Sequence, residues 1–265
     1  MKTTLNSNSF YSNKGNAKVI QFINAEDYMI LDVGCGAGDT GKLIRSMYPH
    51  TEVVGITCSQ AEYAQANQNL SSCICMNIEQ DSLPDKYQNL FDVILFSHIL
   101  EHLINPIETI RKLLSYLKPS GKIIIALPNI AHWRERWKLT LGKFEYTDSG
   151  VMDKTHLHFY TFYTAPQYLI TPIKKLKIEH HLVNGSVPLA FFRHYLFTTA
   201  MKEWIDRLGA KYMPNLFGGE ILIVAKRLFE KFWGYSVSDN NHIFLCFCLF
   251  CCVIVGQKVV YLEVV

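Results

Sequence analysis

A glycine cluster directly after the first apolar run is the feature of this sequence best suited to binding a ligand. It reads LDVGCGAG over residues 31–38. Glycines at a strand end allow a tight turn, and without a Cβ they let a ligand come close to the backbone. The acid before them, Asp32, accepts hydrogen bonds from an ammonium or hydroxyl group and repels a pyrophosphate. The loop therefore predicts a ligand with a cationic or hydroxyl group at this point.

Dinucleotide binding is the competing interpretation of the same loop. Gly36 to Gly41 matches the spacing G-x-G-x-x-G in one register. Dinucleotide-binding folds also carry an acid at the end of the second strand, where it holds a ribose hydroxyl. Here that strand ends at Gly55-Ile56-Thr57, without an acid. This absence and the position of Asp32 both argue against a dinucleotide.

Histidines form the second set of residues suited to chemistry. His98 directly follows the fourth apolar run, and its spacing from Glu101 and His102 is i, i+3, i+4, which predicts one shared helix face. Such a trio suits either a divalent metal or hydrogen bonds at a helix start. We favour hydrogen bonds for Glu101 and His102, and we expect His98 to act as a base or a ligand contact.

The segment 129–163 crowds histidine, arginine and aromatic residues after the fifth apolar run. These types suit a ligand with a polar or anionic group and a flat or apolar face. His132 and His156 are candidate bases, whereas we expect His158 to fix the segment through hydrogen bonds. A zinc site built on His156 and His158 lacks further ligands in the sequence, so no metal is predicted.

Alternating strands and helices must position these residues. Strands are predicted at 29–33, 52–57, 72–78, 91–96, 122–127, 177–183 and 219–226, and helices at 40–48, 60–70, 107–117 and 164–176. The β-α-β-α order of the first part predicts a parallel sheet with helices on both faces. Ligands bind such sheets at the carboxyl ends of the strands, so the glycine loop, His98 and the segment 129–163 should meet there.

Five motifs in order resemble those of class I S-adenosylmethionine-dependent methyltransferases: LDVGCGAG, GITCSQ, CMNIEQDSLP, FDVILFSHILEH and LKPSGKIIIALPN. The resemblance implies an α/β fold with a Rossmann-like, doubly wound, mostly parallel seven-stranded sheet. Its last strand, at 219–226, would be antiparallel, and the segment 129–163 would be an insert that covers the active site. The resemblance also implies S-adenosylmethionine as the cofactor.

The same resemblance assigns cofactor contacts by position. Asp32, Gly34, Gly36 and Gly38 would surround the methionine moiety of the cofactor. Thr57 and Gln60 would bind the ribose, and Asn77 and Ile78 would contact the adenine. Ser97 would contribute a backbone contact to the cofactor. Two positions depart from the common pattern. Thr57 stands where most relatives have an acid, and this GIT-x-S-Q variant resembles cyclopropane synthases and some small-molecule methyltransferases, which tolerate neutral groups here. Asn77 replaces a common Asp but keeps a hydrogen-bonding amide.

The function implied is methyl transfer to an oxygen or nitrogen of a small-molecule, sugar or lipid-precursor acceptor. The segment 129–163 is similar to that of methionine-biosynthesis protein W and of glycan and natural-product methyltransferases. His98, His132 or His156 would assist the acceptor. The Glu101-His102 pair resembles the E-x-x-E-H element of quinone-biosynthesis methyltransferases, but His98 replaces its first Glu and changes the charge of a metal site. The alternative is a non-catalytic cofactor-binding module that acts through a protein partner.

Composition excludes several other classes. The 265 residues are 49% hydrophobic and 18% charged, with a net charge of +3, which is too small for a nucleic-acid-binding surface. The amino-terminal residues lack the apolar core of a signal peptide, so we expect a cytoplasmic protein whose eight cysteines are reduced. No oligomeric state is predicted.

The C-terminal tail, residues 229–265, is predicted to lie outside the methyltransferase domain of residues 1–228. It holds the apolar run IFLCFCLFCCVIV at 243–255, which is shorter than the about 17–25 residues that span a bilayer. Aromatic and cationic residues precede this run. Three alternatives stay open: peripheral membrane contact through residues 226–255, a protein-contact element, or an incidental extension.

Overall fold

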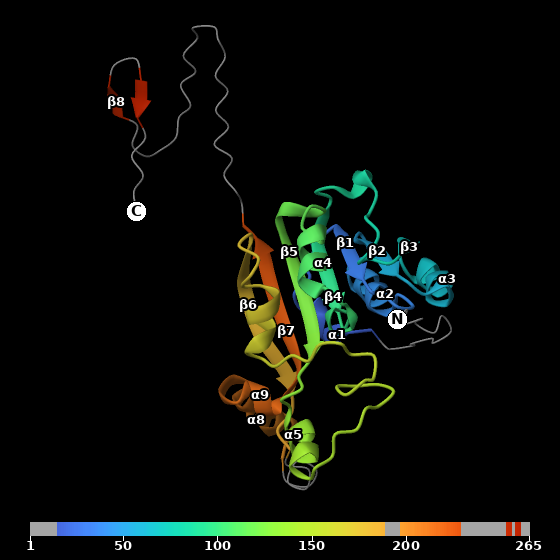
Figure 1. Cartoon of the computed structure of the whole chain (residues 1–265), viewed down its shortest axis with the longest axis vertical. Coiled ribbons are helices and arrows are strands. Elements are labelled where there is room, and N and C mark those ends of the chain that lie inside the picture. Colours follow the sequence, from blue (N-terminus) through green and yellow to red (C-terminus); the bar gives the residue numbers. More distant parts are fainter. Residues whose placement is uncertain (1–14, 189–196, 229–252, 256–257, 261–265) are drawn as a thin grey trace. The chain divides into compact units, whose positions relative to one another are not determined.

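The computed structural model describes residues 15–188, 197–228, 253–255 and 258–260. The chain divides into two compact units, Met1–Glu230 and Lys231–Val265. The first unit contains the sheet and its helices (Figure 1). In the second, β8 (Val253–Val255) pairs antiparallel with β9 (Lys258–Val260).

One seven-stranded sheet runs through the described part of the first unit. Its strands are β1 (Met29–Val33), β2 (Glu52–Thr57), β3 (Ser72–Cys75), β4 (Phe91–Ser97), β5 (Leu117–Pro128), β6 (Leu176–Gly185) and β7 (Gly218–Arg227). The order is β3-β2-β1-β4-β5-β7-β6, and β7 is antiparallel to both β5 and β6 while the other pairs are parallel. This confirms the predicted Rossmann-like, doubly wound, mostly parallel sheet and its antiparallel last strand.

Helices cover the sheet on both faces (Figure 1). The helices on the faces are α1 (Ala17–Ile20), α2 (Asp39–Met47), α3 (Gln60–Asn69), α4 (Pro106–Leu113) and α6 (Thr164–Leu169). Three further helices, α5 (Trp133–Thr140), α8 (Thr199–Tyr212) and α9 (Pro214–Phe217), lie beyond one end of the strands (Figure 1). Local signals explain several starts. Pro106 begins α4, where a missing N–H costs nothing, and the Ser59 hydroxyl accepts a hydrogen bond from the Glu62 amide at the start of α3.

The central strands β1, β4 and β7 are buried on both faces, which explains their continuous apolar runs. Along β4, Ile94 and Phe96 join one core cluster and Val93 and Leu95 the other. All four side chains are at most 1% exposed. The sheet is therefore a rigid base on which the loops at its carboxyl edge are built.

Some predicted boundaries were wrong. The strand predicted at 72–78 ends at Cys75, so Asn77 and Ile78 lie in the following loop. The helix predicted at 107–117 ends at Leu113, and Leu117 already pairs with Phe91 as the first residue of β5. The helices α8 and α9 were not predicted.

The tail predictions fall largely outside the described residues. Of the apolar run 243–255, only Val253–Val255 is described. Among the described helices, none has the length and apolarity needed to cross a bilayer. A cytoplasmic location and membrane contact through residues 226–255 stay predictions.

Candidate active site

The glycine loop connects β1 to α2 at the carboxyl edge of the sheet. Gly34, Gly36 and Gly38 have φ values of 71°, 54° and 82°, a region that side-chain-bearing residues rarely adopt. A Cβ on Gly34 would lie 2.7 Å from the Ile99 side chain, whereas a Cβ on Gly36 would meet only Glu62 Oε1, at 4.0 Å. The loop is thus packed behind Gly34 and open in front of Gly36, where a ligand fits.

Asp32 lies at the end of β1, directly before this loop. The residue is 2% exposed, and its Oδ2 has no hydrogen-bond partner among the described residues. Burial raises the pKa of this carboxyl to about 7. A buried carboxylate oxygen without a donor beside an open glycine cradle fits the cationic methionine moiety of S-adenosylmethionine.

An acid near the end of β2 comes from α3 rather than from the strand. Thr57 Oγ1 donates to Glu62 Oε2 at 2.8 Å, and Glu62 Oε1 is the atom that faces Gly36. Glu62 was not among the predicted residues. The S-x-x-E spacing from Ser59 was available, but it signals a helix capping box rather than a ligand contact. Gln60, which was predicted, is exposed at the start of α3.

Asn77 and Ile78 lie in the loop after β3. The Asn77 side-chain oxygen accepts a hydrogen bond from the Glu79 amide at 3.0 Å, and the Asn77 amide donates to Asp81 Oδ2 at 3.0 Å. Ile78 is buried. This amide oxygen therefore already stabilises its own turn.

Ser97 and His98, at the end of β4, join a network of charged groups. His98 Nε2 lies 2.8 Å from Glu220 Oε1, and its Nδ1 lies 3.4 Å from Glu101 Oε1. Burial opposes the imidazolium charge, but the nearby negative charge of Glu101 and the hydrogen bond to Glu220 outweigh it and raise the pKa of His98 to about 9. At neutral pH His98 is therefore a cation held between two carboxylates.

Glu220, from the start of β7, was missed by sequence reasoning. Asn16 Nδ2 donates to Glu220 Oε1 at 2.7 Å and contacts Ser97 Oγ at 3.3 Å, while Lys18 lies 3.2 Å from Glu220 Oε2. Burial raises the pKa of Glu220, but the bond to His98 outweighs it and the pKa falls to about 2. No local motif signals this acid, because its partners lie far away in the sequence.

The predicted helix face shared by His98, Glu101 and His102 was wrong. His98 has φ 54°, which no helix accommodates, and only Leu100–His102 form a short 3-10 helix after it. His98 therefore turns toward Glu220 while His102 turns toward the segment 129–163.

That segment places the other two candidate histidines differently. His132 precedes α5 and contacts the Trp133 ring, and its ring forms no hydrogen bond with the residues described. Burial and the neighbouring Arg134 lower the pKa of His132. His156 Nδ1 donates to the Val151 carbonyl at 3.0 Å, and its ring packs edge-to-face with that of His102, with the ring centroids 4.7 Å apart. His158 Nε2 lies 3.3 Å from the Ile104 carbonyl.

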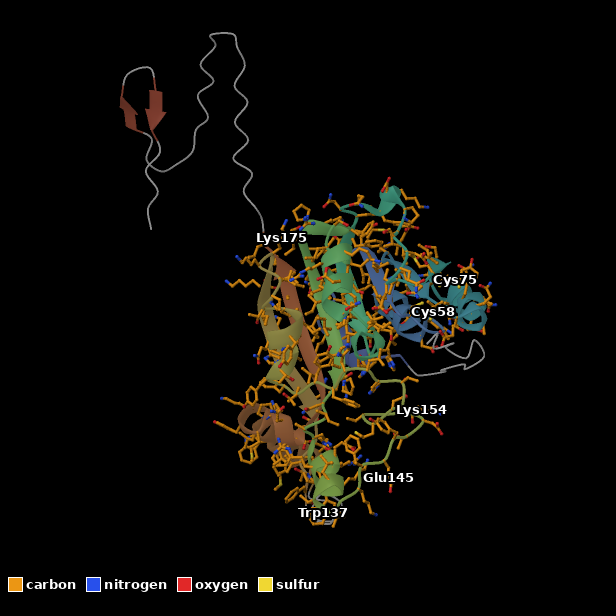
Figure 2. The ribbon with its side chains drawn as sticks, in the orientation of Figure 1. Cys58, Cys75, Trp137, Glu145, Lys154 and Lys175 are labelled. Carbon is orange, nitrogen blue, oxygen red and sulfur yellow. The ribbon has the colours of Figure 1, made fainter. Side chains whose placement is uncertain are left out.

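Main-chain bonds hold the two ends of this segment on the sheet. The Asn129 amide donates to the Gly219 carbonyl at 3.0 Å, and the Ile130 amide to the Tyr160 carbonyl at 3.0 Å. Between these ends α5 and the following loop extend away from the strands, with Trp137 at the far end and Lys154 nearer the sheet (Figure 2).

Known proteins agree with this architecture. Residues 9–164 match the methyltransferase domain family. The trans-aconitate 2-methyltransferases of Escherichia coli strain 55989 and of Shigella flexneri serotype 5b are 24% and 26% identical, each over 82% of both chains.

Two solved structures share the fold. The plantazolicin methyltransferase BpumL in complex with SAH has a TM-score of 0.52 and 21% identity, covering 79% of this chain and 80% of that one. A methyltransferase of Haloferax volcanii, described as putative in its complex with the activator Trm112, has a TM-score of 0.54 and 12% identity, with 80% and 88% covered. The chain belongs to the methyltransferase domain family and is an S-adenosylmethionine-dependent methyltransferase.

Proposed function

We propose that this enzyme transfers a methyl group to an oxygen or nitrogen of a small-molecule acceptor, sugar and lipid precursors included. The observation that supports the proposal is the environment of the His132 ring. Its ring is neutral, without a hydrogen-bond partner among the described residues, and next to Gly219 at the edge where β5 ends. A hydroxyl or amine acceptor needs such a group to take its proton. The relatives named for trans-aconitate support an acceptor of small size.

The cofactor supplies an activated methyl group on a sulfonium. Asp32 would accept from the ammonium of its methionine moiety, and the glycine loop of Gly34, Gly36 and Gly38 would lie against it. Thr57 and Glu62 together would hold the ribose hydroxyls, with Gln60 beside them. Asn77 and Ile78 would flank the adenine, and Ser97 would contribute a backbone contact.

The three predicted histidines would have different tasks. His132 is the best candidate base, because its pKa is lowered and its ring is available. His98, a cation between Glu101 and Glu220, suits orientation of the acceptor better than proton removal. His156 is tied through Nδ1 to Val151 and packs on His102, so it is a weaker candidate for the base.

Two measurements test this proposal. Calorimetry with S-adenosylmethionine should show a loss of about 10- to 100-fold in affinity for Asp32→Ala, because a charge-assisted hydrogen bond is removed. An unchanged affinity would show that Asp32 does not bind the cofactor.

Turnover with a panel of hydroxyl, amine and carboxylate acceptors tests the base. His132→Gln should lower kcat by about 10²- to 10⁴-fold for hydroxyl or amine acceptors and leave cofactor affinity unchanged. His158→Gln, in the same segment, is the matched control and should retain activity. Equal rates for His132→Gln and the wild type would exclude His132 as the base.

A further inference from the structure

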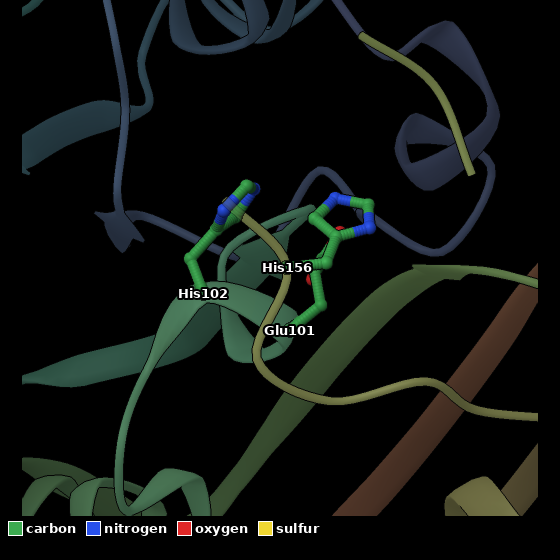
Figure 3. A group of neighbouring side chains, drawn as sticks. All are labelled: Glu101, His102 and His156. Atoms are coloured by element: carbon green, nitrogen blue, oxygen red, sulfur yellow. The ribbon is translucent and has the colours of Figure 1, made fainter. Parts of the chain in front are cut away.

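Glu101, His102 and His156 form a compact cluster beside the candidate active site. One ligand atom from each lies within 4.8 Å of the others (Figure 3). Glu101 and His102 follow β4, whereas His156 belongs to the segment 129–163. The amides of Leu157 and His158 donate to the Glu101 carbonyl at 2.8 and 3.1 Å, so main-chain bonds fix the two segments together. The backbone therefore holds these three residues together, and the cluster is not a chance approach of exposed side chains.

Glu101 lacks the partners that a buried carboxylate needs. It is 0% exposed, and neither carboxylate oxygen accepts a hydrogen bond from the residues described. His98 Nδ1 approaches Oε1 at 3.4 Å, but His98 also serves Glu220 at 2.8 Å. Burial of a carboxylate without hydrogen bonds is costly unless a cation compensates it. We therefore expect a further cation at the second carboxylate oxygen of Glu101, Oε2.

The hydrogen bonds of the two histidines determine which nitrogen is available. The Thr155 hydroxyl donates to Asp153 Oδ1 at 2.7 Å, so at 3.0 Å it must accept from His102 Nδ1. The Val151 carbonyl accepts from His156 Nδ1. In its uncharged form each ring therefore carries its proton on Nδ1 and a lone pair on Nε2. Metal-binding histidines almost always donate their other N–H to such an acceptor.

We propose that Glu101, His102 and His156 bind a divalent transition-metal ion through the Glu101 carboxylate and the two Nε2 atoms. Two imidazoles with one carboxylate suit Zn²⁺, Fe²⁺ or Co²⁺ rather than Ca²⁺ or Mg²⁺, which prefer oxygen ligands. Ligands about 2.0–2.2 Å from such an ion lie roughly 3–3.5 Å apart, so small side-chain movements complete the site.

Three protein ligands leave coordination positions open, as in catalytic zinc sites. The open positions would take an oxygen of the acceptor, and this role alone rests on the proposed function. Asp153 and Thr155 would orient His102 from behind, as carboxylates orient the histidines of known metal sites.

Cobalt(II) is the probe for the test, because its visible spectrum reports the ligand type. The full-length chain, with its cysteines reduced and metals removed by a chelator, is titrated with Co²⁺. We expect one ion per chain, with the absorption of nitrogen and oxygen ligands and without the thiolate charge-transfer band that cysteine binding would give. His156→Ala and His102→Ala should each weaken binding at least about 100-fold, and His158→Ala should not change it.

Thr155→Val separates a metal site from a merely structural cluster. It should weaken Co²⁺ binding about 10- to 100-fold, because it removes the acceptor for His102 Nδ1. Each variant is first checked for unchanged circular dichroism and cofactor affinity. A wild type that binds no Co²⁺, a thiolate spectrum, or full binding by both His156→Ala and His102→Ala would overturn the proposal. No acceptor is used, so these outcomes are independent of the proposed methyl transfer.

Discussion

The proposed cofactor side and the proposed acceptor side of the active edge are assembled in different ways. On the cofactor side, Asp32, the glycine loop, Thr57 and Glu62 come from consecutive strands and the helices between them. On the acceptor side, Glu220 meets His98 across 122 positions of sequence and Asn16 across 204, and His102 meets Thr155 across 53. The comparison shows that short motifs encode the cofactor side, whereas only the folded topology creates the acceptor side.

The largest contrast is expected between two glycines with the same backbone angle. Gly34 and Gly142 both have φ 71°, but a Cβ would lie 2.7 Å from Ile99 at Gly34 and meet nothing within 4 Å at Gly142. Gly34→Ala should reduce the affinity for S-adenosylhomocysteine at least about 100-fold, because strain and overlap combine. Gly142→Ala, in the segment 129–163, should change it less than about threefold. Equal effects in calorimetry would show that crowding behind the loop is unimportant.

A substitution of Asn129 tests whether the acceptor side can be destabilised without changing the affinity for the cofactor. Its side chain is 0% exposed, donates to the carbonyls of Gly218 (2.6 Å) and Asn215 (3.3 Å), and accepts from the Ala131 amide at 3.0 Å. Asn129→Ala should lower the free energy of unfolding by about 2–3 kcal/mol and reduce turnover, with cofactor affinity nearly unchanged.

Asn67→Ala is the matched control on the cofactor side. Asn67 is exposed and accepts one bond, from the Cys73 amide at 3.2 Å, so urea unfolding should detect a loss below about 1 kcal/mol. A large loss of cofactor affinity in Asn129→Ala would contradict the independence of the two sides.

Glu62 and Gln60 are alternative candidates for contact with the cofactor ribose. Glu62→Gln should weaken S-adenosylmethionine binding about tenfold, since one charge-assisted hydrogen-bond acceptor is lost. Gln60→Ala should have a smaller effect, because Gln60 is exposed. Calorimetry on both variants distinguishes them. A greater loss in Gln60→Ala would assign the ribose to Gln60, as the sequence pattern predicted.

The smallest expected effect is a pH dependence from Asp32. In the unfolded chain this carboxyl ionises near 3.8, and burial raises its folded pKa to about 7. The stability of the cofactor-free protein that comes from neutral Asp32 is therefore full below about pH 4 and lost as the pH rises through 7. Cofactor binding needs the ionised form, so affinity should fall, by at most about tenfold per unit, as the pH drops below 7.

Asp32→Asn is the control for this dependence. Its affinity should be weak and nearly constant between about pH 5.5 and 7.5, because no carboxyl titrates there. A wild-type affinity that is constant over the same range would show that another group balances the Asp32 charge.

Most of the sheet was predictable from the sequence because its strands are buried on both faces. Apolar runs such as that of β4 mark such strands directly. The end of β3 and the helix before β5 were misplaced because pairing with neighbouring strands, not local propensity, decides where they stop. The helix α8 was missed because its amphipathic pattern is weak and the neighbouring residues mix polar and apolar types without a clear period.

Site residues followed the same division. Asp32 and the glycines stand in one contiguous motif, so their position could be predicted. Glu62 was missed because its spacing from Ser59 has an ordinary capping explanation. Glu220 and the His102–His156 contact were beyond reach, since no spacing rule connects residues that only the sheet order brings together.

The position of β7 between β5 and β6 affects the order in which the sheet is completed during synthesis. Synthesis proceeds from the amino end, so β6 leaves the ribosome with no strand beside it, and the sheet stays open until Gly218–Arg227 inserts. Glu220 arrives with that strand and brings the carboxylate that pairs with His98. A nascent chain that stops before β7 already contains the whole glycine loop but lacks this acid. The residues proposed to bind the cofactor are therefore all synthesised before the acid on the proposed acceptor side.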